Sequence, residues 1–354
     1  MYLSKPVLNQ DDTTWGSLLG GGAYIENDQR HFLLSVFNLH QPHPSGITTR
    51  FLPHGIAMDP QDKLRLVLFE KIGPGACEVD LGGGTVTRPL PASAGHAFYG
   101  HGAFSPDGSL LYATETALNG LTGAITVRDG RSLALLGAFP SYGHKPHDCQ
   151  LIDDGRTMVV ANAGAGSLGE AGCLSYVDVQ TGALLERVPV PNDRVNAGHF
   201  AIAGNGDVAL ISAPTDGLGP AHNGGVALRH PKSPLMAASA APHFKHQLKG
   251  ETLSVAINTA GNLALTCTPD ANLVCAWRLD TQQLVKAMPY STPRGITLSA
   301  DGNHFLISYG NNAAVIAIHA ETLAPVSKAY SEKSFLTGSH LWNWQREVRS
   351  TSLR

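Results

Sequence analysis

The sequence predicts an all-β protein that folds as a seven-bladed β-propeller, with four antiparallel strands in each blade as in WD40-like and YVTN-like repeats. Three observations lead to this prediction. A tight-turn signal recurs seven times along the chain, apolar runs of strand length flank the turns, and no amphipathic stretch is long enough for a substantial helix. The turns recur roughly every 40 to 50 residues, which is the length of one propeller blade.

Each turn signal joins two apolar runs. Around residues 106–108, for example, GAF precedes the tripeptide PDG and LLYATE follows it. A short turn of this composition between two apolar runs is typical of a β-hairpin. We therefore expect every repeat to open with a hairpin. The seven signals are NDQ 27–29, PQD 60–62, PDG 106–108, DDG 153–155, GNG 204–206, TAG 259–261 and ADG 300–302.

Two further strand-like runs follow most hairpins, such as LSYVDVQTG and LLERVPV after the turn at 153–155. Four strands in each of seven repeats account for the length of the chain. We expect a single propeller domain over residues 19–346, with an N-terminal tail at 1–18 and a C-terminal tail at 347–354. No glycine-rich phosphate loop followed by helical periodicity is present, which excludes a Rossmann fold.

Composition narrows the possible partners. The 354 residues carry a net charge of -3 and no run of Lys or Arg, so neither nucleic acid nor an anionic membrane surface is an expected partner. No apolar stretch approaches the roughly 18 residues of a membrane-spanning helix, so we expect no membrane insertion. The five cysteines show no C-x-x-C spacing, which excludes a zinc finger. Cys267 and Cys275 flank a short turn and form either a disulfide or two buried thiols.

Histidines occupy a repeated position. Counting back seven or eight residues from each turn gives the residue that opens the inner strand, and in four consecutive repeats this residue is histidine. The short C-terminal segment LTGSHLWNWQ can add a fifth histidine to the same ring. Inner strands of a propeller line its central channel, and converging neutral imidazoles bind transition metals, here iron or copper. The predicted metal ligands are His54, His101, His147, His199 and His340.

Other interpretations of the histidines stay open. A Gly-His pair at this place in WD-type blades can act as a structural hydrogen-bonding relay, and the pairs at 54–55 and 101–102 fit that role. The protein would then be a scaffold that offers a propeller face to a protein partner. Ser254 and Arg294 interrupt the histidine series, whereas a structural relay should recur in every blade. This interruption favours the metal site.

A metal-dependent enzyme is the other alternative, with Arg294 and Glu115 as candidate catalytic residues. Arg294 is costly in a channel without an anion, which points to Glu115 or to a small anionic substrate. Strand alternation directs Asp148 away from the channel if His147 faces it, so Glu115 is the better carboxylate for completing a metal shell. No Gly-x-Ser-x-Gly elbow occurs, which argues against serine hydrolysis.

The runs PHGIAMDP, FYGHGAFSPDGSLLYATE and HDCQLIDDGRTMVVANAG resemble the bacterial propeller family called domain of unknown function 1513. The resemblance extends over about residues 20 to 345, and the five predicted histidine ligands match its pattern. It implies an exported, periplasmic propeller that accompanies iron-uptake components. Asp148, Cys149 and Ala97 depart from the family's pattern.

Localisation depends on the N-terminus, which has no basic start and no apolar leader segment. Periplasmic residence therefore requires that a leader was removed before residue 1. If residue 1 is the native start, we expect a cytoplasmic protein.

Overall fold

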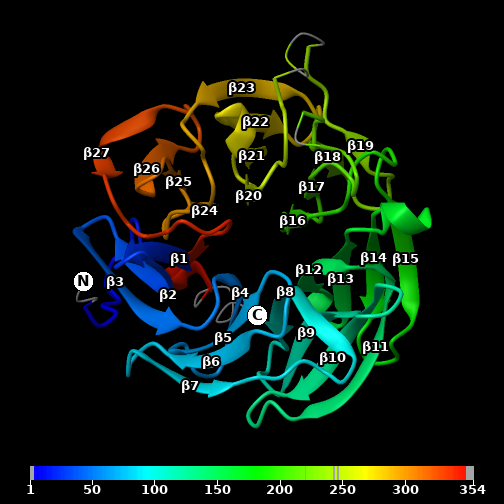
Figure 1. Ribbon diagram of the computed structural model, residues 1–354. Helices are drawn as coiled ribbons and strands as arrows, with labels where there is room; N and C mark the ends of the chain where they lie inside the picture. The colour runs from blue at the N-terminus through cyan, green and yellow to red at the C-terminus, as the bar shows by residue number, and fades with distance from the viewer. Residues whose placement is uncertain (1–3, 220, 242–243, 245–246, 348–354) are drawn as a thin grey trace.

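The computed structural model describes residues 4–219, 221–241, 244 and 247–347. These residues form seven four-stranded antiparallel sheets, which stand around a central axis like the blades of a propeller (Figure 1). The predicted all-β, seven-bladed architecture is confirmed. Helical structure in the described residues amounts to short 3-10 turns at Asp153–Gly155, Gly166–Leu168 and Pro269–Ala271, residue 244, and one turn at residues 344–347. No described helix is long and apolar enough to cross a bilayer.

Six blades are built from consecutive strands, and the first strand of each faces the axis. Their strands are β4 (Pro53–Met58), β5 (Arg65–Glu70), β6 (Ala76–Asp80) and β7 (Thr85–Pro89); β8 (His96–Phe104), β9 (Leu110–Ala117), β10 (Thr122–Asp129) and β11 (Leu135–His144); β12 (Pro146–Ile152), β13 (Thr157–Asn162), β14 (Cys173–Asp178) and β15 (Leu184–Pro189); β16 (His199–Ile202), β17 (Val208–Ser212), β18 (Gly225–Arg229) and β19 (Met236–Ala237); β20 (Ser254–Asn258), β21 (Leu263–Thr268), β22 (Leu273–Arg278) and β23 (Leu284–Pro289); β24 (Ile296–Leu298), β25 (His304–Tyr309), β26 (Ala314–His319) and β27 (Pro325–Ser331).

The seventh blade joins the two ends of the chain. Its strand order is β28-β1-β2-β3, with β1 at Ser17–Glu26, β2 at Gln29–Asn38, β3 at Gln41–Thr49 and β28 at Trp342–Asn343. Because β28 is the inner strand, the turn at 27–29 joins the second and third strands of this blade. The prediction that every signal opens a repeat is therefore wrong for this turn. The other six signals join first and second strands as predicted.

Ring closure relies on side chains as well as on the short strand β28. The amide of Asn343 donates to the carbonyl oxygens of Trp15 at 2.7 Å and of Leu298 at 3.0 Å. The backbone N–H of Ser17 donates to the side chain of Gln345 at 2.6 Å. These hydrogen bonds attach the C-terminal segment to the first strand of the chain and to the neighbouring blade.

The hydrophobic core lies between neighbouring blades. Between the blades of β4–β7 and β8–β11, for example, Phe69, Phe98, Phe104 and Leu111 pack in one buried cluster. Because each sheet buries its apolar faces against its neighbours, the inner strands are left to line a channel with polar side chains. All five cysteines are buried free thiols, including the two on either side of the turn at 269–271.

Candidate metal centre

Three of the five predicted histidines stand in β-bulges. In β4 and β12, the residues on either side of His54 and of His147 pair with consecutive residues of the next strand, so that each histidine is an extra, unpaired residue. A larger irregularity between Phe98 and Gly102 includes His101 in β8. A bulge breaks the alternation of a strand and redirects its side chains. This local geometry turns the three imidazoles toward the axis.

Glycine allows these bulged strands to pack closely. Gly100 has a φ of +123°, and a Cβ atom there would lie 3.0 Å from the carbonyl oxygen of His147. A Cβ atom on Gly55 would lie only 2.2 Å from the carbonyl oxygen of Gly100. Side chains at these two positions would therefore push the bulges apart.

The remaining ring positions lie at or just before the start of an inner strand. His199 opens β16 and Ser254 opens β20, while Arg294 and His340 each stand two residues before their inner strands, β24 and β28. Ser254 is used structurally, because its hydroxyl accepts a hydrogen bond from the backbone N–H of Ile296 at 3.1 Å. The expectation that the C-terminal segment brings His340 into the ring is confirmed.

The five imidazoles form one cluster. The ring centroid of His54 lies 4.7 to 5.2 Å from those of the other four. The ring of His199 lies 4.4 Å from that of His147 and 4.0 Å from that of His340. One nitrogen from each of His54, His101, His199 and His340 lies within 4.8 Å of the others. His147 stands beside this group of four.

Several nitrogens of the cluster have the geometry of metal ligands. The Nε2 atoms of His199 and His340 are 3.1 Å apart, which suits two ligands that each bind one ion at about 2.0–2.1 Å. Among the described residues, the buried Nε2 atoms of His54 and His101 have no hydrogen-bond partner. Buried polar atoms normally have a partner, and a metal ion in the middle of the cluster would provide one for both of these nitrogens.

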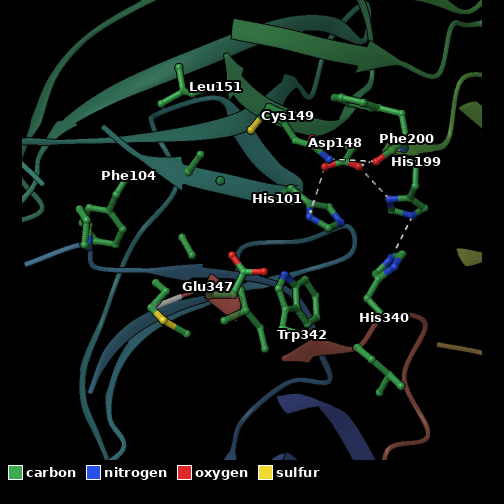
Figure 2. Close-up of a pocket in the computed structure, with 18 of the residues that line it drawn as sticks. His101, Phe104, Asp148, Cys149, Leu151, His199, Phe200, His340, Trp342 and Glu347 are labelled. Atoms are coloured by element: carbon green, nitrogen blue, oxygen red, sulfur yellow. Dashed lines mark hydrogen bonds and ion pairs between the residues drawn. The ribbon is translucent and has the colours of Figure 1, made fainter. Parts of the chain in front are cut away.

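Asp148 faces the cluster, contrary to the sequence prediction. Its Oδ1 lies 3.5 Å from Nδ1 of His101, and its Oδ2 lies 3.6 Å from Nδ1 of His199 (Figure 2). The backbone N–H of Phe200 donates to Oδ2 at 3.3 Å. The prediction assumed regular alternation, but the bulge at His147 shifts the alternation by one residue. No sequence signal marks this bulge.

An oxygen atom lies near Nδ1 in three of the histidines. Nδ1 of His101 and of His199 lie 3.5 and 3.6 Å from the carboxylate of Asp148, and the buried Nδ1 of His199 makes no hydrogen bond with the described residues. Nδ1 of His147 donates to the carbonyl oxygen of Tyr99 at 2.8 Å, which leaves its Nε2 with a lone pair. A carboxylate or carbonyl behind the imidazole is the usual support of a metal-bound histidine.

Burial controls the charge of the cluster. It lowers the pKa of all five imidazoles well below the ordinary value, to about 3 for His101. It also raises the pKa of Asp148 to about 7. The imidazoles are therefore neutral near neutral pH, and neutral imidazole is the form that binds a metal.

We expect the metal-free protein to lose stability as the pH falls below 6.5, the ordinary histidine pKa. The unfolded chain then takes up protons at its histidines, whereas the buried imidazoles stay neutral, so the free energy of unfolding decreases. Asp148 acts in the opposite direction between pH 3.8 and about 7, as one group against five. Urea denaturation with a chelator, from about pH 7.5 to 5, measures this dependence. Constant stability over this range would contradict it.

Glu115 pairs with residues of its own blade and not with the histidine cluster. Its Oε1 accepts hydrogen bonds from Arg128 at 3.1 Å and from Thr126 at 3.0 Å, and its Oε2 accepts one from the backbone of Ser93 at 3.0 Å. The ion pair with Arg128 lies within the blade and is fully buried. These contacts hold Glu115 within its blade, so the structure does not bring it to the histidines, and its catalytic role stays a prediction. Alternation along β9 does not distinguish the channel from the space between blades.

Arg294 is subject to the electrostatic influence of carboxylates of the protein itself. Its Nε donates to the carbonyl oxygen of Gly338 at 3.4 Å. Burial lowers the pKa of Arg294, while the carboxylates of Glu251 and Asp270 act in the opposite direction. A substrate is therefore not needed to explain its charge, and its role as a substrate anchor stays a prediction.

A cavity of about 520 Å³ adjoins the cluster. His101, His199 and His340 form part of its wall, as does Asp148. Figure 2 shows these side chains on one side of the cavity and Phe104 on the other. The cavity was not predicted, because its walls come from inner strands of several blades whose relative depth is set only by the assembled ring.

Comparison with known structures supports the architecture. Hydrazine synthase from Kuenenia stuttgartiensis superposes with a TM-score of 0.64 at 14% identity, over 82% of this chain and 92% of that chain. Dihydro-heme d1 dehydrogenase NirN, in complex with DHE, superposes with a TM-score of 0.63 at 13% identity, over 98% of this chain and 78% of that chain. At such identities the similarity shows the fold alone.

Sequence comparison gives the family. No curated protein matches the chain. The family model described as protein of unknown function DUF1513 matches residues 47–342, which include all five histidines of the cluster and six complete blades. The chain therefore belongs to the DUF1513 family.

Proposed function

We propose that this propeller binds one first-row transition-metal ion through imidazole nitrogens in its central channel. The observation that carries the proposal is the convergence of four nitrogens, from His54, His101, His199 and His340, to within 4.8 Å of one another. Each comes from a different blade, so the site exists only in the assembled ring. His147 is the additional imidazole beside these four.

The donor set narrows the choice of ion. Neutral imidazole suits iron, copper, nickel and zinc, whereas magnesium and calcium require oxygen ligands. The general affinity order of divalent metals favours copper in a site of this kind. The family resemblance favours iron. We propose iron or copper as the natural ion, in metal handling or redox chemistry.

Metal analysis tests the proposal directly. The protein is purified anaerobically, divided, and challenged with Fe(II), Cu(II), Zn(II) or Mg(II), after which unbound ions are removed and bound metal is measured by mass spectrometry. We expect close to one iron or copper ion per chain and no retained magnesium. Failure to retain any transition metal after challenge would exclude the proposed function.

Asp148→Asn is expected to weaken metal binding by roughly 10- to 100-fold without abolishing it, as replacements behind a metal-bound histidine do. The carboxylate has an oxygen for Nδ1 of both His101 and His199, whereas an amide has only one. Competition against a chromophoric chelator measures the change. Asp154→Asn is the matched control, since Asp154 is exposed at a turn. Equal affinity in the two variants would contradict the role of Asp148.

A metal-dependent enzyme is a second candidate, favoured by the cavity beside the imidazoles. An ion bound by the four imidazoles could contact a small molecule there. Arg294→Ala tests the predicted anchor: loss of turnover with unchanged metal content would support it, and parallel loss of metal would contradict it. Periplasmic residence, expected from the family resemblance, stays a proposal that cell fractionation tests.

A further inference from the structure

An ion pair crosses the central channel. Nζ of Lys71 lies 3.7 Å from Oε1 of Glu251. Lys71 belongs to the blade of β4–β7, whereas Glu251 precedes the first strand of the blade of β20–β23. These blades are not neighbours, because two other blades separate them on one side of the ring and three on the other (Figure 1). The ion pair therefore joins opposite sides of the channel.

This ion pair lies at the same end of the channel as the imidazoles. Lys71 directly follows β5, whose last residue pairs with the first residue of β4, next to His54. Glu251 stands three residues before Ser254, which opens β20 at the ring position that histidine takes in other blades. Both charged residues thus stand just beyond the ends of the strands where the imidazoles converge.

Backbone hydrogen bonds hold both sides of the ion pair in place. The loop after Lys71 is attached to β8, since the N–H of Gly73 donates to the carbonyl oxygen of Phe98 at 3.2 Å and the N–H of Phe98 donates to that of Gly73 at 2.9 Å. On the opposite side, the N–H of Thr252 donates to a carbonyl oxygen at the end of β17 at 3.0 Å. The two charges are therefore carried on anchored backbone at the histidine end of the channel.

The positive charge of Lys71 acts on the histidine cluster. Burial is the main cause that lowers the pKa of the imidazoles, and the charge of Lys71 lowers it further for His54, His101, His147 and His340. Imidazoles that bind a metal are neutral, so they offset none of the charge of a bound ion. Coulomb repulsion is proportional to that charge, and it is therefore twice as large for a divalent as for a monovalent ion.

Other charged groups of this region stay the same when the ion pair is altered. Asp148 lies against the cluster, and Arg294 stands two residues before β24 in the ring. The carboxylate of Asp270 acts on Arg294, and Lys145 pairs with Asp216. Because variants of the ion pair keep all of these groups, the effect of its two charges can be measured by difference.

We propose that Lys71 is a specificity-determining residue that biases the histidine cluster toward metal ions of lower charge, such as Cu(I) over Cu(II), and that Glu251 opposes this bias. The inference rests on the proposed metal site and adds the ion charge that the site prefers. It depends on one lysine and one glutamate, and not on the protonation of an imidazole or of Asp148. The two side chains are 44% and 35% exposed, so water and salt weaken the effect.

Lys71→Met and Glu251→Gln test the proposal, because they break the same ion pair but change the local charge in opposite directions. Affinities for Zn(II) and Cu(I), a divalent and a monovalent ion, are measured by competition with chromophoric chelators, anaerobically for Cu(I). We expect Lys71→Met to tighten Zn(II) binding about three- to tenfold and Cu(I) binding by less. Glu251→Gln should weaken Zn(II) binding by a similar factor, and added salt should reduce both effects.

Matched controls and a double variant complete the experiment. Lys328→Met and Glu321→Gln remove exposed charges in the outer part of one blade and should leave both affinities unchanged. Lys71→Met combined with Glu251→Gln should bind Zn(II) nearly as the unaltered protein does, because the two changes of charge cancel. Thermal unfolding checks that every variant is folded.

A merely structural role of the ion pair would change the affinity in the same direction in both single variants. Changes in the same direction, or an unaltered ratio of Zn(II) to Cu(I) affinity in Lys71→Met, overturn the proposal. If the unaltered protein binds no transition metal, the proposed function fails and this inference fails with it. Metal binding that neither variant alters contradicts the role of Lys71 alone and leaves the proposed function intact.

Discussion

Replacement of His199 by alanine is expected to abolish stoichiometric metal binding. His199 is central in the cluster, with its ring 4.0 Å from that of His340 and 4.4 Å from that of His147. The variant loses one donor nitrogen and one of the two imidazoles that Asp148 orients. Mutation of a residue that supports a metal ligand typically weakens metal binding by roughly 10- to 100-fold. Loss of the ligand itself should therefore weaken metal binding by at least about 100-fold. Bound metal after challenge and gel filtration measures the loss.

His40→Ala is the matched control, since it removes an exposed imidazole outside the cluster. It should retain the stoichiometry of the unaltered protein, which shows that histidine content alone does not set metal binding. Thermal unfolding in the presence of chelator checks that both variants are folded. A folded His199→Ala protein that keeps one ion at unchanged affinity would remove His199 from the set of ligands.

Replacement of Glu115 by alanine is expected to lower the free energy of unfolding by about 3–5 kcal/mol. The carboxylate pairs with Arg128 at 3.1 Å where both side chains are almost completely buried. Without Glu115 the guanidinium keeps its hydrogen bonds to the carbonyl oxygens of Pro91 and Leu133 but has no buried counter-charge. Urea denaturation measures the change, and the folded fraction should bind metal as before.

A double variant separates the effect of the uncompensated Arg128 charge on stability from the effect of lost packing. Glu115→Ala combined with Arg128→Met removes both charges, so it should recover part of the stability that Glu115→Ala loses. Glu321→Ala, at an exposed carboxylate, should change the free energy of unfolding by less than about 0.5 kcal/mol. Loss of metal binding in a fully folded Glu115→Ala protein would instead restore Glu115 to the site.

The fold was predictable because its signals are local. Six turn signals stand between the first two strands of their blades, where short polar turns reverse the chain between apolar strands. The signal at 27–29 has the same local chemistry but joins the second and third strands. The difference arises from the two-residue strand β28, which pairs with β1 across most of the sequence. A contact between residues this far apart in the sequence produces no periodic pattern in the sequence.

The ligand cluster was partly predictable for the same reason. A fixed distance from the turns placed His54, His101, His147 and His199 at equivalent heights on the inner strands, and the structure brings all four together with His340. The carboxylates were assigned wrongly, because the assignment relied on strand alternation. One bulge reverses the direction of Asp148. The buried partner of Glu115 is Arg128 on another strand of the blade, and strand alternation does not identify it.

Closure of the ring by β28 has a consequence for the order of biosynthetic events. His340, which completes the group of four imidazoles, lies just before β28 and is therefore synthesised after the six blades of β4 to β27. Before β28 pairs with β1, the other imidazoles have no closed ring to hold them at a common height. The group of four is therefore assembled only when the ring closes, and an ion bound there would link segments that are far apart in the polypeptide and resist the opening of the ring.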